Sequence, residues 1–234
     1  MNSKPRIGIV GDGNVGSALA RGLARAGYRV ETTGKNPERV QEVTSSAEII
    51  ILAVPHDERK NAIQEMGDAF RGKVLVDTSN LITKGMEYDG NLKQSGAEDV
   101  QSWAKEAKVV KAFNTVFSQH MSTGQVEGER VSLLVACDDP TAKKQVMSLG
   151  QDIGFDAVDA GDLSNARWLE TLGVLNITMA YAKPKLGPRF GLRVLGLASS
   201  RSTSPPPEGN VDGRGLATPA TEMPSSGSPT GNSK

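Results

Sequence analysis

The stretch IGIVGDGNVGSALARGLARAGYRV, residues 7–30, decides the fold. A short apolar run leads into the glycine pattern G-x-G-x-x-G at Gly11, Gly13 and Gly16. A segment with helical spacing follows, and then a second β-branched run. A lone glycine pattern of this kind is weak evidence, but here it follows a predicted strand and opens a predicted helix. The order predicts a βαβ unit that binds a dinucleotide.

Each residue of the loop has a separate role in that prediction. Gly11 allows a tight turn, Gly13 lets a pyrophosphate approach the backbone, and Gly16 lets the helix pack closely on the strand. The amides and dipole at the helix start, at Asn14 and Val15, then face the phosphate charge. These five residues form the predicted pyrophosphate site. A glycine turn without a ligand is the alternative.

The chain after the second predicted strand favours NADP over NAD. NAD-binding proteins usually place an acidic residue at that strand end, whereas this chain has Thr33 and Gly34. Lys35 and Arg39 can pair with a 2′-phosphate, and the Thr33 hydroxyl can donate a hydrogen bond to it. Two alternatives stay open. Lys35 and Arg39 can be a solvated helix start, and Glu31 can serve as the acid if the strand ends early.

Alternation of strand and helix patterns continues beyond this unit and predicts an α/β fold. We expect a doubly wound, mostly parallel Rossmann sheet. The predicted strands are residues 6–10, 28–33, 48–54, 74–77, 108–111 and 131–136. The predicted helices are residues 14–26, 37–43, 57–70, 140–149 and 163–181. Residues 78–100 are expected to form a long loop, and Asn36-Pro37 and Asp139-Pro140 are helix-start signals.

Composition divides the chain into three parts. Residues 1–161 are the predicted NADP-binding domain, and residues 162–198 a short C-terminal helical segment that covers substrate or a dimer interface. From residue 199 to 234, 19 of 36 residues are Pro, Ser or Gly, and none is aromatic. Such a segment buries too little apolar surface to offset its ordering entropy, so we expect a disordered tail.

The nicotinamide end of the site is expected beyond the third and fifth strands. Ala53, Val54 and Pro55 end the third strand, and Asn114 follows the fifth. Ligands of open α/β sheets bind beyond these carboxyl ends, at the point where the strand order reverses. Val54 and Pro55 can flank the nicotinamide ribose, and Asn114 can hydrogen-bond the ribose or carboxamide. An ordinary strand-to-helix turn is the alternative for each.

Other chemistry is poorly supported by the sequence. His56 and His120 both fall in predicted loops, and a catalytic role is the less favoured interpretation of each. Cys137 has no Cys or His at metal-ligand spacing, so we interpret it as a buried structural thiol and expect no metal. Lys and Arg balance Asp and Glu at 27 each. We therefore expect no nucleic-acid partner and no membrane partner. A single cysteine and the absence of a signal-peptide apolar run in the first residues predict a cytoplasmic location.

Five segments together resemble a known family. They are IGIVGDGNVGSALARGLARAGYRV, TGKNPERV, AEIIILAVP, KVLVDTSN and VVKAFNTVF. The chain is similar to NADPH-dependent reductases of the coenzyme F420 oxidoreductase family, and to the cytosolic reductase domains of the six-transmembrane epithelial antigen metalloreductases. Where the family commonly has Ser-Arg after the second strand, this chain has Gly34-Lys35. The charge is kept but a bidentate fork is lost, so we expect looser discrimination for NADP.

The resemblance implies hydride transfer between NADP(H) and a flavin or a deazaflavin such as coenzyme F420. Two stacked rings exchange a hydride without a strong protein acid, which agrees with the few catalytic-looking residues. We do not expect the transmembrane haem domain of the metalloreductases. We expect the chain to form a homodimer. The alternatives are an NADPH-dependent reductase of a small imine or carbonyl compound, and a non-catalytic NADPH-sensing module.

Overall fold

The computed structural model describes residues 4–82, 88 and 93–196. The chain divides after Leu195 into two units, Met1–Leu195 and Gly196–Lys234, and all the helices and strands given below belong to the first. The tail predicted at residues 199–234 lies outside the described residues. The boundary predicted between residues 161 and 162 stays a prediction.

Five parallel strands form the central sheet, and all of them were predicted within two residues at each end. They are β1 (Ile7–Val10), β2 (Val30–Thr33), β3 (Ile49–Leu52), β4 (Val74–Asp77) and β5 (Lys108–Lys111). Their order in the sheet is β2-β1-β3-β4-β5. In register, Ile7 lies opposite both Val30 and Ile49. The order reverses between β1 and β3, so a ligand is expected beyond the carboxyl ends of these two strands.

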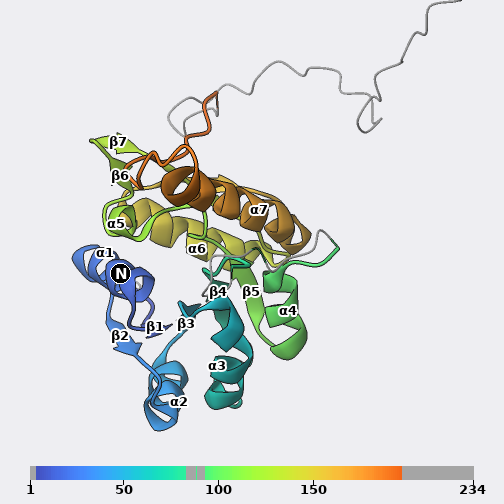
Figure 1. Ribbon diagram of the computed structural model, residues 1–234. Coiled ribbons are helices and arrows are strands. Elements are labelled where there is room, and N and C mark those ends of the chain that lie inside the picture. Colours follow the sequence, from blue (N-terminus) through green and yellow to red (C-terminus); the bar gives the residue numbers. More distant parts are fainter. Residues whose placement is uncertain (1–3, 83–87, 89–92, 197–234) are drawn as a thin grey trace, which may run out of the picture. The chain divides into compact units, whose positions relative to one another are not determined.

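Helices cover both faces of this sheet (Figure 1). Helices α1 (Asn14–Arg25) and α6 (Pro140–Ile153) pack on one face, and α2 (Pro37–Ser46), α3 (Arg59–Met66) and α4 (Gly96–Trp103) on the other. Alternate residues of β3 divide accordingly: Ile49 and Ile51 join the first core cluster, and Ile50 and Leu52 the second. Burial on both faces explains why these strands are continuous apolar runs rather than alternating ones. The predicted doubly wound fold is confirmed.

Two helices begin where their cap residues predict. The Asn36 side chain accepts a hydrogen bond from the amide of Arg39, at 3.0 Å, at the start of α2. The Asp139 carboxylate accepts one from the amide of Ala142, at 2.8 Å, at the start of α6. In both helices proline occupies the first turn, where a missing N–H costs nothing.

The region after β4 and the last strands differ from the prediction. Helix α4 begins at Gly96, inside the stretch predicted as a loop, because Ser95 and Glu98 form a capping box. Strand β8 (Ser132–Val135) pairs in parallel with β9 (Asp156–Asp159), a strand that the sequence analysis missed. Strand β8 joins β5 through one antiparallel bridge, between Lys111 and Ala136, instead of extending the parallel sheet. With two apolar residues in DAVD, β9 has too weak a pattern to be recognised.

Short elements and a final helix complete the described fold. They are a 3₁₀ turn (His56–Glu58) before α3, α5 (Ser118–Met121), a hairpin of β6 (Gln125–Val126) and β7 (Glu129–Arg130), a 3₁₀ turn (Leu163–Asn165), α7 (Ala166–Ile177) and a π-helical turn (Thr178–Ala182). The predicted helix 163–181 therefore corresponds to three consecutive elements. Within the described ranges, no helix combines the length and apolarity needed to cross a bilayer.

Candidate functional site

The glycine loop between β1 and α1 has the geometry that its sequence predicts. Gly11 has φ +116°, and a Cβ there would lie 2.2 Å from the carbonyl oxygen of Ala53. A Cβ on Gly16 would lie 1.8 Å from the carbonyl oxygen of Gly11, so only glycine lets the helix start so close to the loop. A Cβ on Gly13 would meet nothing within 4 Å. Gly13 therefore borders open space, where a ligand can approach the backbone.

The start of α1 is open to an anion. Gly13 is the N-cap residue, no side chain caps the helix, and the first turn contains no acidic residue. The loop is held in place by backbone hydrogen bonds from the amide of Gly11 to Thr33, 2.8 Å, and from the amide of Ala53 to Val10, 2.8 Å. A helix N-terminus with a rigid loop and no acidic residue in its first turn is suited to a phosphate group.

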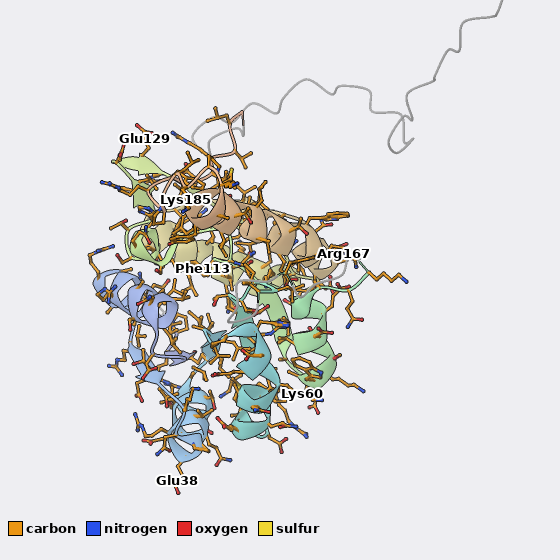
Figure 2. The ribbon with its side chains drawn as sticks, viewed as in Figure 1. Glu38, Lys60, Phe113, Glu129, Arg167 and Lys185 are labelled. Carbon is orange, nitrogen blue, oxygen red and sulfur yellow. The ribbon has the colours of Figure 1, made fainter. Side chains whose placement is uncertain are left out.

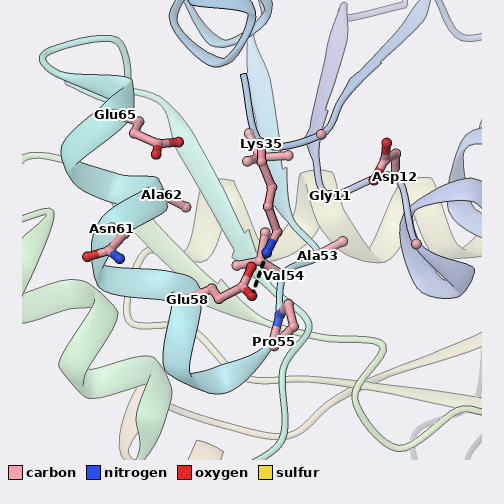
Figure 3. A pocket seen from close by; sticks show the side chains of 13 residues that line it. Gly11, Asp12, Lys35, Ala53, Val54, Pro55, Glu58, Asn61, Ala62 and Glu65 are labelled. Atoms are coloured by element: carbon pink, nitrogen blue, oxygen red, sulfur yellow. Dashed lines mark hydrogen bonds and ion pairs between the residues drawn. The ribbon is translucent and has the colours of Figure 1, made fainter. Parts of the chain in front are cut away.

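A cleft of about 510 Å³ opens beside this loop, at the carboxyl ends of β1, β2 and β3. Figure 3 shows it between the glycine loop and helix α3. We call it the first cleft. It is lined by Val10, Gly11, Asp12, Gly13, Gly34, Lys35, Ala53, Val54, Pro55, Glu58, Asn61, Ala62 and Glu65. It therefore lies where the sheet topology predicts a ligand.

An ion pair spans the first cleft. The Lys35 Nζ lies 2.9 Å from Oε1 of Glu58, which is on the turn before α3 (Figure 3). The Lys35 side chain is 82% exposed and that of Glu58 23% exposed. The hydrogen bond and the charge of Glu58 raise the pKa of Lys35, so the amine stays protonated. Lys35 thus presents a cation to the cleft, but a cation that already has a counter-ion.

Gly34, next to Lys35, has little room for a side chain, because the Asp12 carboxylate lies close to it. A Cβ at this position would lie 2.7 Å from Oδ2 of Asp12 in the glycine loop. A serine in place of Gly34 would require the Asp12 side chain to turn away. Gly34 therefore fits beside the Asp12 carboxylate, and a larger residue at this position would have to displace that carboxylate.

The structure gathers half of the predicted site residues in the first cleft: Gly11, Gly13, Lys35, Ala53, Val54 and Pro55. Asn14 and Gly16 lie in the first turn of α1. Thr33 and Arg39 are not among the lining residues. Thr33 is buried, and its hydroxyl is directed at the carbonyl of Gly34, 3.5 Å away. The Arg39 guanidinium pairs with Glu42 one turn along α2.

The other two predicted residues, Val15 and Asn114, line a second cleft of about 250 Å³. It lies at the carboxyl ends of β4 and β5, against α7. The lining residues are Val15, Thr78, Asn80, Asn114, Thr115, Val116, Phe117, Ser118, Met121, Gly173, Asn176, Ile177 and Tyr181. Within the described part of the chain, none of the lining residues is a carboxylate, a histidine or an amine. The second cleft is thus a neutral pocket of apolar, aromatic, hydroxyl and amide groups.

Asparagines organise this second cleft. Asn114 donates to Oδ1 of Asn80, 2.9 Å, and to the carbonyl of Leu169, 2.8 Å. Asn176 on α7 donates to the carbonyl of Thr115, 3.0 Å. The Oδ1 atoms of Asn114 and Asn176 are buried and accept no hydrogen bond from any described residue. Because an unpaired buried acceptor is costly, these atoms fit a ligand that donates N–H groups, such as a carboxamide.

The backbone before Asn114 is strained. Phe113 has φ +67°, a value that L-residues rarely adopt, and its side chain is fully buried. Phe113 is labelled in Figure 2. Its ring contacts that of Phe155 edge to face, with the centroids 5.9 Å apart. This anchoring holds a turn that reverses the chain after β5 and places Asn114 against α7. Strain of this kind persists where the surrounding packing determines it, often at functional sites.

A buried ion network that the sequence analysis missed lies beneath the second cleft. The Lys111 Nζ donates to Asp77, 2.8 Å, to Glu170 on α7, 2.7 Å, and to the carbonyl of Ser79, 2.6 Å. The Arg59 guanidinium lies 3.7 Å from Asp77. All four charged side chains are at most 1% exposed. Burial raises the pKa of Asp77, but the Lys111 ammonium and the Arg59 guanidinium outweigh it, so that the pKa lies below its ordinary value.

The histidines and the cysteine have structural contacts. The carbonyl oxygen and ring of His56 both contact the Arg59 guanidinium, and Nε2 of His120 bonds the carbonyl of Pro188, 2.9 Å. Neither histidine lines either cleft. Cys137 is buried, and no group of His, Cys, Asp or Glu among the described residues is arranged to hold a metal.

Sequence reasoning also missed Glu58, Asn61 and Glu65 in the first cleft. A signal existed, because these residues are three and seven positions apart in a predicted helix that directly follows the third strand. That spacing puts them on one helix face. The network residues carried no such signal, since they come from four separate elements.

Comparisons with known proteins agree with this geometry. Residues 6–46 match the model of the family described as NADP oxidoreductase coenzyme F420-dependent. The F420-dependent NADP reductase of Methanothermobacter marburgensis is 26% identical over 204 residues, covering 72% of this chain and 89% of the reductase. A solved structure from Arthrobacter sp. FB24, described as a candidate F420-dependent NADP reductase, has a TM-score of 0.72 and 26% identity. The similarity covers 81% of this chain and 99% of that one.

A second group of relatives consists of longer proteins. Metalloreductase STEAP3 of Rattus norvegicus is 32% identical over 181 residues, which is 72% of this chain and 36% of the metalloreductase. The chain thus spans little more than a third of the length of the curated metalloreductases that it matches. Together these findings confirm the resemblance predicted from the motifs.

Proposed function

We propose that this chain, which is related to the F420-dependent NADP reductases and the STEAP metalloreductases, is an NADP-dependent oxidoreductase. It transfers a hydride between NADP(H) and a flavin or deazaflavin acceptor. The single observation that carries this proposal is the open start of α1 at Gly13, with a cation, Lys35, in the same cleft. This combination suits a dinucleotide whose adenosine carries a pyrophosphate and, in addition, a 2′-phosphate.

The two clefts divide the cofactor between them. In this proposal the first cleft takes the adenosine half, with the pyrophosphate at the start of α1 and the 2′-phosphate at Lys35. Val54 and Pro55 flank the ribose on the nicotinamide side. The nicotinamide then reaches the second cleft, where the unpaired Oδ1 atoms of Asn114 and Asn176 offer acceptors for its carboxamide. NADPH supplies the hydride when it is bound.

The protein's own contribution is binding, orientation and exclusion of water. The second cleft offers Phe117, Ile177 and Tyr181 as surfaces for a planar ring. Its neutral lining suits direct hydride transfer between stacked rings, which needs register more than an acid or a base. The acceptor is therefore proposed to be a ring of the flavin or deazaflavin type.

A turnover assay tests this function. Purified protein is mixed with NADPH and each of FMN, FAD, riboflavin and coenzyme F420, and absorbance at the NADPH band is followed. We expect NADPH oxidation with at least one of these acceptors and slower oxidation of NADH. Tight NADPH binding with no oxidation by any acceptor would support the NADPH-sensing module instead.

Reduction of a small imine or carbonyl compound is the second candidate, and one observation favours it. The Tyr181 hydroxyl is a weak acid at the second cleft, and its side chain is 51% exposed. Such a reduction requires a proton donor. Tyr181→Phe keeps the ring but removes the donor. Turnover of a cyclic imine by the wild type that is lost in Tyr181→Phe would favour this candidate over the flavin-type acceptor.

A further inference from the structure

We propose that Glu58 sets how strictly this chain discriminates NADPH from NADH, by competing with the 2′-phosphate for Lys35. The inference rests on the proposed function, because it concerns the cleft that takes the adenosine half. It assigns a specificity-determining role to a residue of the turn before α3, outside the β2 end where that choice is usually made.

The charges of the first cleft carry this inference. Among its described lining residues Lys35 is the one base, whereas Asp12, Glu58 and Glu65 are acids. The base is already engaged, since its Nζ lies 2.9 Å from Oε1 of Glu58. Figure 3 shows the two side chains reaching toward each other across the cleft. A 2′-phosphate that binds Lys35 therefore arrives beside a carboxylate.

Two opposing effects then decide selectivity. The phosphate carries about −1.5 to −2 charges, and Lys35 attracts it as a point charge. Glu58 repels the same phosphate and holds Lys35 in another direction. Because the Lys35 side chain is 82% exposed, water weakens its pair with Glu58, and a phosphate can displace that carboxylate. NADPH is therefore preferred, but by less than Lys35 alone would allow.

NADH offers a clear contrast. It lacks the 2′-phosphate and has no need to displace Glu58 from Lys35. Removing the negative charge of Glu58 should thus strengthen NADPH binding and leave NADH binding almost unchanged. The expected gain for NADPH is about three- to tenfold, the range for an interaction between partly exposed charges.

The experiment measures dissociation constants by isothermal titration calorimetry for NADPH, NADH, adenosine 2′,5′-bisphosphate and AMP. The proteins are the wild type, Glu58→Gln and Glu106→Gln. The control Glu106→Gln removes the same charge from another ion-paired glutamate, the partner of Arg71, that is not in the first cleft. Circular dichroism verifies that each variant is folded. We expect tighter binding of NADPH and of the bisphosphate in Glu58→Gln alone.

A double-mutant cycle separates this role from a structural one. In a Lys35→Met background, Glu58→Gln should lose the part of its effect on NADPH that comes from competition for Lys35, and only the direct repulsion of the phosphate by Glu58 should remain. Unchanged selectivity in Glu58→Gln, or weaker NADH binding with unchanged NADPH binding, would overturn the inference. The second result would mean that the Glu58 carboxylate accepts hydrogen bonds from the ribose hydroxyls. A wild type that binds neither nucleotide would instead refute the proposed function.

Discussion

Lys35 follows β2 by two residues, and its side chain lies in the first cleft. At the end of this strand, where this chain has Thr33 and Gly34, NAD-binding proteins usually have an acid that binds the ribose hydroxyls. Its ammonium is kept protonated, and it is the one basic group among the described residues that line this cleft. In the proposed function, the choice of cofactor therefore depends mainly on this residue.

Reversing that charge is the first prediction. Lys35→Asp should weaken NADPH binding by at least about tenfold, because it replaces a charge-assisted contact with repulsion. NADH binding should change little. Titration calorimetry with both nucleotides measures the two constants. An equal loss for both would mean that Lys35 does not contact the 2′-phosphate.

Lys111 carries the second prediction, which concerns stability. Its ammonium is fully buried between Asp77 and Glu170. Lys111→Met keeps the length of the side chain but leaves buried carboxylates without this partner. The free energy of unfolding should fall by about 3 to 5 kcal/mol, as when one member of a buried ion pair is removed. Urea unfolding followed by circular dichroism measures it, and a loss below about 1 kcal/mol would contradict the role assigned to the network.

The same network gives a prediction for pH. The pKa of Asp77 is lower in the folded protein, so its stabilising contribution is complete above its unfolded-state pKa of about 3.9 and is lost as the pH falls below it. In Lys111→Met the buried carboxylates lack that partner, and protonation relieves the penalty. The stability deficit of Lys111→Met relative to the wild type should therefore shrink between pH 7 and pH 4. A deficit that stays constant over this range would contradict the assigned charges.

Some of these residue roles could be predicted from the sequence and others could not. The glycine roles followed from local sequence, because Gly11 and Gly16 are constrained by neighbours close along the chain or in the adjacent strand. Lys111 was noted only as part of the segment VVKAFNTVF. Asp77 lies opposite Lys111 once β4 and β5 pair, and Glu170 becomes a neighbour only once α7 packs against them. Tertiary proximity of this kind leaves no mark in a single sequence.

Among the elements, helix α4 shows how a local signal can be overlooked. Ser95 is fully buried, its hydroxyl accepts from the amide of Glu98, 3.1 Å, and the Glu98 carboxylate accepts from the amide of Ser95, 2.7 Å. The amides of Gly96 and Ala97 donate to Glu170 on α7. The S-x-x-E pattern was present in the sequence, but Gly85, Gly90 and Gly96 were the reason for predicting a loop over residues 78–100. Strand β9 had no comparable signal.

Removing the cap tests that account of α4. Ser95→Ala should lower the free energy of unfolding by about 0.5 to 2 kcal/mol, because the amide of Glu98 loses its acceptor. Urea unfolding again gives the value. Ser102→Ala is a suitable control, since this hydroxyl lies near the end of the same helix and is exposed. Equal losses in the two variants would argue against a specific capping role.

Taken as a whole molecule, the described unit exposes apolar side chains along α7 and the turn that follows it. Trp168 is 56% exposed, Leu175 51% and Tyr181 51%. Figure 1 shows α7 at the surface of this unit. Tyr181 also lines the second cleft. An apolar helix face beside a cleft is typical of a surface that a partner covers, and the homodimer expected from the sequence stays a prediction for this face.

Sedimentation equilibrium tests the homodimer. The wild type should sediment as a dimer, and Leu175→Glu should sediment as a monomer, because a charge on this face cannot be buried without a counter-ion. Gln41→Glu, at an exposed polar position of α2, adds the same charge on another helix and gives the comparison. A monomeric wild type would contradict the prediction directly.

Nucleotide binding by the intact chain is the most direct measure of the central claim. The claim is that the start of α1 holds a pyrophosphate while Lys35 favours a phosphorylated adenosine. Isothermal titration calorimetry with NADPH and NADH, on protein shown to be folded by circular dichroism, tests both halves at once. We predict one binding site per chain, with tighter binding of NADPH than of NADH. No heat with either nucleotide would contradict the account.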